Sequence, residues 1–104
     1  MYALAILLGG AAPPAPDPKL AADNFYRCAE MFITSYDDGI SPANIVAKAI
    51  ANKCQTDALG WVNALAQSKT MNRDAAMEIF QEAMRGDDAN LIMAVLEHRV
   101  AKRR

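Results

Sequence analysis

The stretch CAEMFITSYDDGISPANIVAKAIANKC, residues 28–54, contains both cysteines of this 104-residue chain. Its centre holds Gly39, which favours the left-handed backbone that ends many helices, followed by Ser41-Pro42, a typical helix start. Apolar residues recur at steps of three and four on both sides of this turn. The stretch therefore predicts two helices joined by a tight turn, with one cysteine in each helix.

The two cysteines are expected to lie at nearly the same distance from the turn, on two antiparallel helices. The helical path is about 15 Å from Cys28 to Asp38 and about 18 Å from Pro42 to Cys54, at a rise of about 1.5 Å per residue. Because alanines keep the seam between the helices thin, the two Cα atoms can approach to the roughly 4.4–6.8 Å that a disulfide needs. We expect a Cys28–Cys54 disulfide, and the alternative is two buried free cysteines.

A metal site and a cofactor are not expected. Zinc sites use four ligands at short spacings, whereas this chain offers two distant cysteines and one histidine, His98.

An even number of cysteines in a small domain is typical of oxidising compartments. A bridge across this loop would stabilise the fold by roughly 3–4 kcal/mol.

The remaining segments also predict helices. Hydrophobic residues make up 53% of the chain and charged residues 22%, which suffices for a core. The second predicted helix runs from Pro42 to Leu65, and the sequence leaves open whether Gly60 bends or splits it. Alternating strand patterns are absent. We therefore expect an all-α fold over residues 19–104, a compact bundle of about four helices with a disulfide-stapled N-terminal helical hairpin.

Caps and apolar stripes place these helices along the chain. The predicted N-caps are Asp17, Ser41, Asn72 and Asp88. The third helix ends at Gly86 and is expected to bury Met77, Phe80 and Met84. The apolar face of the fourth helix consists of Leu91, Ile92, Val95, Leu96 and Val100.

The N-terminal residues differ from the rest of the chain. An apolar run over residues 2–8 is followed by small residues at 9–11, which predicts a signal peptide over residues 1–11 with cleavage before Ala12. Residues 12–18 form a proline-rich spacer. The apolar run is shorter than the roughly 20 residues of a transmembrane helix. We expect a periplasmic or secreted protein, and the alternative is a cytoplasmic one whose N-terminus packs on the domain.

The hairpin region resembles a group of small exported bacterial proteins with two cysteines and an all-helical fold, whose function is uncharacterised. The resemblance covers residues 26–54, with a cysteine on one helix, a turn of the form Y-D-D-G-x-S, an alanine-rich helix and a second cysteine. It implies a location in the cell envelope and a stapled hairpin. It carries no catalytic residue.

No arrangement of residues in this sequence predicts catalysis. The chain lacks a Gly-x-Ser-x-Gly nucleophile motif, and its single histidine, His98, is expected near a helix C-terminus. Asp37 and Asp38 lack the alternating oxygen ligands of a calcium loop and are expected to end a helix. We therefore expect a protein that is not an enzyme.

Two groups of residues form the predicted partner surface, which would contact an unknown protein. Met77 and Met84 share a helix face, and flexible methionines suit varied partners. The basic C-terminal end supplies Arg99, Lys102, Arg103 and Arg104.

These features predict a non-enzymatic helical protein with a structural or protein-binding role. The alternative is a cytosolic regulatory or nucleic-acid-associated module that uses the basic end. The net charge of −1 provides no overall attraction for nucleic acid, so we do not expect a nucleic-acid partner. The sequence does not define the oligomeric state.

Overall fold

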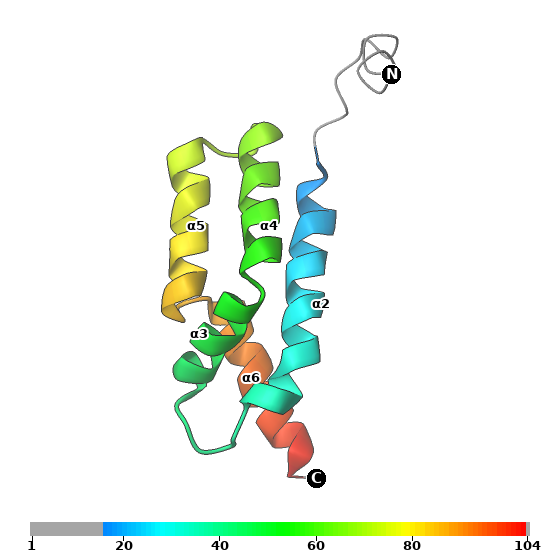
Figure 1. Ribbon diagram of the computed structural model, residues 1–104, viewed down its shortest axis with the longest axis vertical. Helices are drawn as coiled ribbons and strands as arrows, with labels where there is room; N and C mark the ends of the chain where they lie inside the picture. Colours follow the sequence, from blue (N-terminus) through cyan, green and yellow to red (C-terminus); the bar gives the residue numbers. More distant parts are fainter. Residues whose placement is uncertain (1–15, 104) are drawn as a thin grey trace, which may run out of the picture.

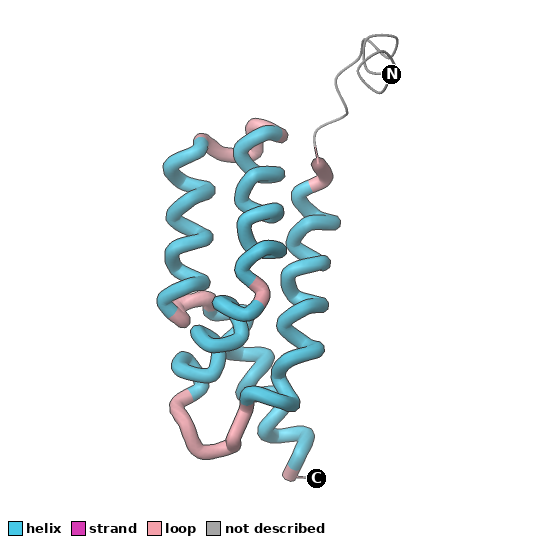
Figure 2. The backbone as a smooth tube through the Cα atoms, viewed as in Figure 1, coloured by secondary structure: helices cyan, strands magenta, loops and turns pink. Residues whose placement is uncertain are grey.

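The computed structural model describes residues 16–103, and this part of the chain is all helical (Figures 1 and 2). The helices are α2 (Pro18–Tyr36), α3 (Ala43–Lys53), α4 (Gln55–Gln67), α5 (Arg73–Arg85) and α6 (Ala89–Lys102). The all-α prediction is thus confirmed. The predicted signal peptide, residues 1–11, lies outside the described residues, as does most of the spacer.

Local hydrogen bonds define most helix starts as the sequence predicts. The Asp17 carboxylate accepts a hydrogen bond from the Lys19 backbone N–H at 3.0 Å at the start of α2, where Pro18 occupies the first position. Asn72 caps α5 in the same way, and Asp88 caps α6.

The start of α3 differs from the prediction that Ser41 caps it. Pro42 occupies the cap position, and no side chain accepts a hydrogen bond there. The Ser41 hydroxyl instead donates to Asp38 Oδ2 at 2.7 Å, while Asp38 Oδ1 accepts hydrogen bonds from the backbone N–H groups of Ile40 and Ser41. Asp38 therefore organises this turn, because its carboxylate satisfies three donors at once.

The predicted second helix is present as two segments that meet at Cys54. Cys54 has φ −98° and ψ 27°, which departs from helical geometry, and its backbone N–H still donates to the Ile50 carbonyl at 3.0 Å. Gly60, the residue at which a split was considered, lies inside the continuous helix α4. The bend at Cys54 turns α3 away from the direction of α4 (Figure 1). Both segments pack against α2 and α5, and α3 also packs against α6.

The helices pack in two halves along the molecule. In one half α4 lies between α2 and α5, and in the other α3 contacts α2, α5 and α6 (Figure 1). The main core contains four fully buried large side chains from α2, α3 and α6: Phe25, Ile50, Leu91 and Val95. A second, smaller cluster of Val62, Leu65 and Ala76 holds the far ends of α4 and α5 together.

An aromatic group connects α2 to α4 and α6. The Trp61 ring stacks on Phe25 with centroids 5.8 Å apart and meets the edge of Tyr26 at 5.7 Å. The Tyr26 hydroxyl donates to Asp88 Oδ2 at 2.8 Å. Burial and this hydrogen bond raise the pKa of Tyr26 well above its ordinary value. Asp88 thus caps α6 and also positions that helix against α2.

Candidate functional site

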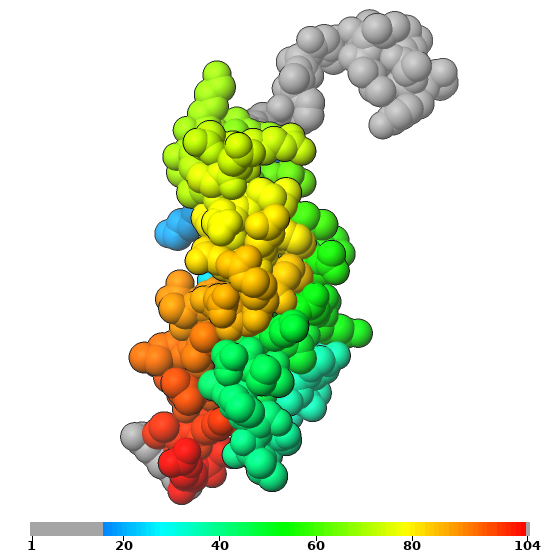
Figure 3. Space-filling view, turned by 90° about the vertical axis from the view of Figure 1, so that its left-hand side faces the viewer, coloured from blue at the N-terminus to red at the C-terminus, as the bar shows by residue number. Residues whose placement is uncertain are grey.

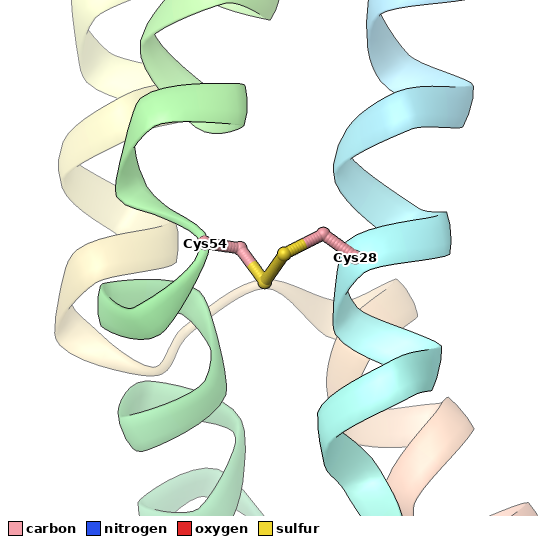
Figure 4. The surroundings of a disulfide bond; sticks show 2 residues. All are labelled: Cys28 and Cys54. Atoms are coloured by element: carbon pink, nitrogen blue, oxygen red, sulfur yellow. A yellow bond between two sulfur atoms is a disulfide. The ribbon is translucent and has the colours of Figure 1, made fainter.

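Cys28 and Cys54 form a disulfide, as the sequence predicts (Figure 4). Their Cα atoms lie 6.0 Å apart, within the usual range of about 4.4–6.8 Å. The bridge joins the middle of α2 to the junction between α3 and α4. Because both sulfur atoms are in this bond, the two cysteines stabilise the structure and neither is a free thiol.

Arg99, predicted to belong to a partner surface, is placed inside the fold by an ion pair with Asp37. Its Nη2 and Nε atoms donate to Asp37 Oδ1 at 2.8 and 3.0 Å, and Nη2 also donates to the Ser41 carbonyl. The Asp37 side chain is 2% exposed and that of Arg99 15% exposed. The pair fastens α6 to the turn between α2 and α3.

The environment of this turn stabilises both of its carboxylates in the charged form. The hydrogen bonds from Arg99 are the main cause of a lowered pKa at Asp37. At Asp38, the hydrogen bond from the Ser41 hydroxyl and those from the Ser41 and Ile40 backbone lower the pKa to about 2. Both groups therefore stay negative throughout the neutral range.

We expect Asp37→Asn to destabilise the protein at pH 7 by about 2 kcal/mol, since the amide leaves the Arg99 charge without its partner. Because the pKa of Asp37 is lower in the folded than in the unfolded state, its contribution is complete above about pH 4 and is lost as the pH falls through the folded-state value. The difference between the wild type and the variant should therefore shrink below about pH 4. Urea unfolding at several pH values measures it.

A matched control for this prediction is Asp23→Asn, which changes an exposed carboxylate on α2. It should alter the stability by less than about 0.5 kcal/mol. Parallel stability curves for wild type and Asp37→Asn over the acid range would show that the ion pair does not contribute as described.

His98 lies near the C-terminal end of α6, as the sequence predicts, and its Nε2 atom is buried without a hydrogen-bond partner among the described residues. Two of the three serine hydroxyls are engaged locally: that of Ser41 donates to Asp38 Oδ2, and that of Ser68 donates to the Leu65 carbonyl. In residues 16–103 no group of histidine, cysteine and acidic side chains is arranged to hold a metal ion.

The other predicted partner residues lie in two separate places. Met77 and Met84 are half-buried on α5, where the fully buried positions are Ala76 and Ala83. Met84 packs against the main core. α5 packs mainly on α4 and α3, whereas α6, the helix that carries Arg99 and Lys102, packs mainly on α3 and α2. The methionines and the basic residues therefore do not form one continuous surface.

Lys102 and Arg103 are exposed at the end of α6, beside the turn that contains Gly39. Arg104 lies outside the described residues. Of the predicted basic group, two residues are therefore shown to be accessible, and a third, Arg99, is engaged by Asp37.

A further apolar surface on α6 was not identified from the sequence. Met93, Leu96 and Val100 are 55%, 42% and 47% exposed, and we call these three residues the α6 face. Leu91 and Val95 point into the core as predicted, whereas Leu96 and Val100, predicted on the same buried face, lie at the surface. The sequence did contain a signal for this surface. The segment that forms α6 has apolar residues on more than one side, which is more than a single buried stripe needs.

The α6 face borders a surface groove of about 550 Å³, which Glu97 and Ala101 also line. Figure 3 shows α6, coloured orange to red, at the surface beside the turn and the start of α3. Successive members of the α6 face are three and four residues apart, so they line up along the helix axis. This geometry suits contact with another elongated apolar element.

No family model matches this chain, and neither a curated protein nor a solved structure is significantly similar to it. The resemblance seen over residues 26–54 therefore stays a prediction. None of the helices α2–α6 combines the length and the apolar character needed to cross a membrane.

Proposed function

We propose that this protein is a non-enzymatic binding module of an oxidising, extracytoplasmic compartment, and that it engages a protein partner through the α6 face. The observation that carries the proposal is the exposure of three large apolar side chains in a row on one helix. Contiguous apolar surface on a small domain is costly in water and is typical of interaction sites.

The spacing on the α6 face indicates the shape of the partner. Met93, Leu96 and Val100 follow the i, i+3, i+7 pattern of a helix that pairs with another helix. Ala101, beside Val100 in the groove, is small enough for two backbones to approach closely. The partner that fits is an amphipathic helix with its own apolar stripe.

The charge around the α6 face indicates the chemistry of the partner. Lys102 and Arg103 are exposed just beyond Val100, at the C-terminal end of the stripe. A partner helix that carries acidic residues at the corresponding end would complement them. We therefore assign an acidic amphipathic helix of another protein as the occupant.

The extracytoplasmic part of the proposal is supported by the disulfide, because such bonds persist in oxidising compartments. The alternative of a cytosolic nucleic-acid-associated module has weaker support. Arg99 is neutralised by Asp37, which leaves Lys102 and Arg103 as the accessible basic residues of the described C-terminal end.

Site-specific photo-crosslinking in the native host tests the proposal. A photoreactive residue at position 96 should capture a partner with an acidic amphipathic helix, and one at position 59 should not. Leu59 is a matched control because it is an exposed leucine on a different helix, α4, at 37% exposure. Leu96→Glu should reduce recovery of the partner about tenfold or more, whereas Leu59→Glu should leave it unchanged. Equal effects of the two substitutions would contradict the proposal, provided both variants retain their melting temperature.

A further inference from the structure

A cavity of about 310 Å³ lies where the end of α6 meets the turn between α2 and α3, at the end of the molecule shown lowest in Figure 1. Its lining consists of Asp37, Gly39, Arg99, Lys102 and Arg103. The volume falls at the small end of the range of about 300–1,000 Å³ for ligand sites. The cavity shares no lining residue with the groove at the α6 face. Lys102 and Arg103 line the cavity and are also the residues that would meet the acidic end of the proposed partner helix.

The cavity carries an excess of positive charge. Its lining includes three basic residues and one acid, and the Asp37 carboxylate is already matched by Arg99. The charges of Lys102 and Arg103 are left to face the cavity and the solvent. Asp38, beside Gly39 in the turn, also acts electrostatically on Arg99 and offsets part of this charge. The remaining positive charge favours an anion.

Arg99 adds a donor whose position is fixed. Its Nε and Nη2 atoms are held by Asp37 and Ser41, while Nη1 donates to no acceptor within the described residues. A guanidinium that is already oriented loses little side-chain entropy when it binds a ligand. Arg99 can therefore bind an anion with its remaining N–H groups while it still fastens α6 to the turn.

We infer that this cavity is a binding site for a phosphate group. A phosphate monoester carries about −1.5 to −2 charge at neutral pH and has three strong acceptor oxygens, which matches the surplus of two basic side chains and the free edge of Arg99. The group belongs either to a small phosphorylated molecule or to the headgroup of an anionic lipid. Ile40, 87% exposed and adjacent to Gly39 in the turn, provides an apolar contact for the lipid source.

Titration of the full-length oxidised protein with inorganic phosphate, followed by NMR, tests the site. The Gly39 backbone N–H and Arg99 Nε–H signals should shift and saturate. The double variant Lys102→Gln/Arg103→Gln should bind phosphate about tenfold or more weakly, because two charge-assisted contacts are removed. The matched control, Lys19→Gln/Arg27→Gln, removes the same charge from exposed positions on α2 and should bind as the wild type does.

Sedimentation with phosphatidylglycerol vesicles, against phosphatidylcholine vesicles, distinguishes the two sources. Binding that is lost in Ile40→Ser, while the phosphate titration is unchanged, identifies the lipid headgroup as the source. Phosphate binding without vesicle binding identifies a small phosphorylated molecule. The inference is overturned if phosphate produces no saturable shift at Gly39 or Arg99, or if both double variants weaken binding equally. The phosphate titration contains no partner protein, whereas the crosslinking test depends on Leu96, so the two proposals can fail separately although both involve Lys102 and Arg103.

Discussion

Reduction of the Cys28–Cys54 disulfide is expected to lower the melting temperature of this protein by about 12–24 °C. The bridge spans a sequence separation of 26 residues, and closing a loop of this length removes about 3 kcal/mol of chain entropy from the unfolded state. Each kcal/mol corresponds to about 4–8 °C in a domain of this size. Thermal unfolding followed by circular dichroism, with and without reductant, measures the effect.

Alanine variants of the two cysteines provide the controls. Cys28→Ala and Cys54→Ala should cost similar amounts, and the double variant little more, because either change removes the whole bridge. The melting temperature of the double variant should not respond to reductant. Non-reducing mass spectrometry should show the bridged peptide directly. Two free thiols under oxidising conditions would contradict the pairing and remove the main support for an extracytoplasmic location.

Gly86→Ala is expected to destabilise the protein by about 2–5 kcal/mol. Gly86 ends α5 with φ +86°, a conformation that costs other residues about 1–2 kcal/mol. A Cβ atom there would also lie 2.4 Å from the Asn44 carbonyl oxygen and 2.9 Å from Lys48 Cβ, both on α3. The backbone oxygen can move away only if α3 shifts, which adds an overpacking cost of about 1–3 kcal/mol. Urea unfolding of the variant measures the sum.

Substitutions at two other glycines distinguish the cost of the left-handed backbone conformation from the cost of the contact with α3. Gly39 has φ +75° but open space around its Cα, so Gly39→Ala should cost only the conformational part, about 1–2 kcal/mol. Gly60 lies inside α4 with open space around it, and Gly60→Ala should stabilise the protein by about 0.5–1 kcal/mol. If Gly86→Ala costs no more than Gly39→Ala, then the close approach of α5 to α3 is not rigid.

The sequence by itself determined the features that depend on neighbours along the chain. Asp17, Asn72 and Asp88 cap helices as predicted because each carboxylate or amide reaches N–H groups two or three residues further on. Gly86 ends α5 for an equally local reason, its access to the left-handed conformation. The disulfide could be predicted from the sequence as well, because Cys28 and Cys54 lie at similar helical distances from the turn that joins α2 and α3.

The tertiary structure decided where the second predicted helix breaks. From the sequence, Gly60 was the obvious weak point of that helix because it lacks a side chain. The break falls at Cys54, which is tied to α2 by the disulfide and is buried in the core. Gly60 remains helical because no packing contact forces a change of direction there. The helix breaks at Cys54 because α3 has to contact α2, α5 and α6 at once.

The tertiary structure also decided the chemistry of the candidate sites. Asp37 and Arg99 are separated by 62 residues, so no local pattern pairs them, and their pairing neutralises the charge of Arg99. The α6 face is exposed because α2 and α3 cover only one side of α6, although Leu96 and Val100 are as apolar as the buried Leu91 and Val95. Helix ends follow from bonds within a few residues, but which side of a helix meets water is set by the helices packed around it.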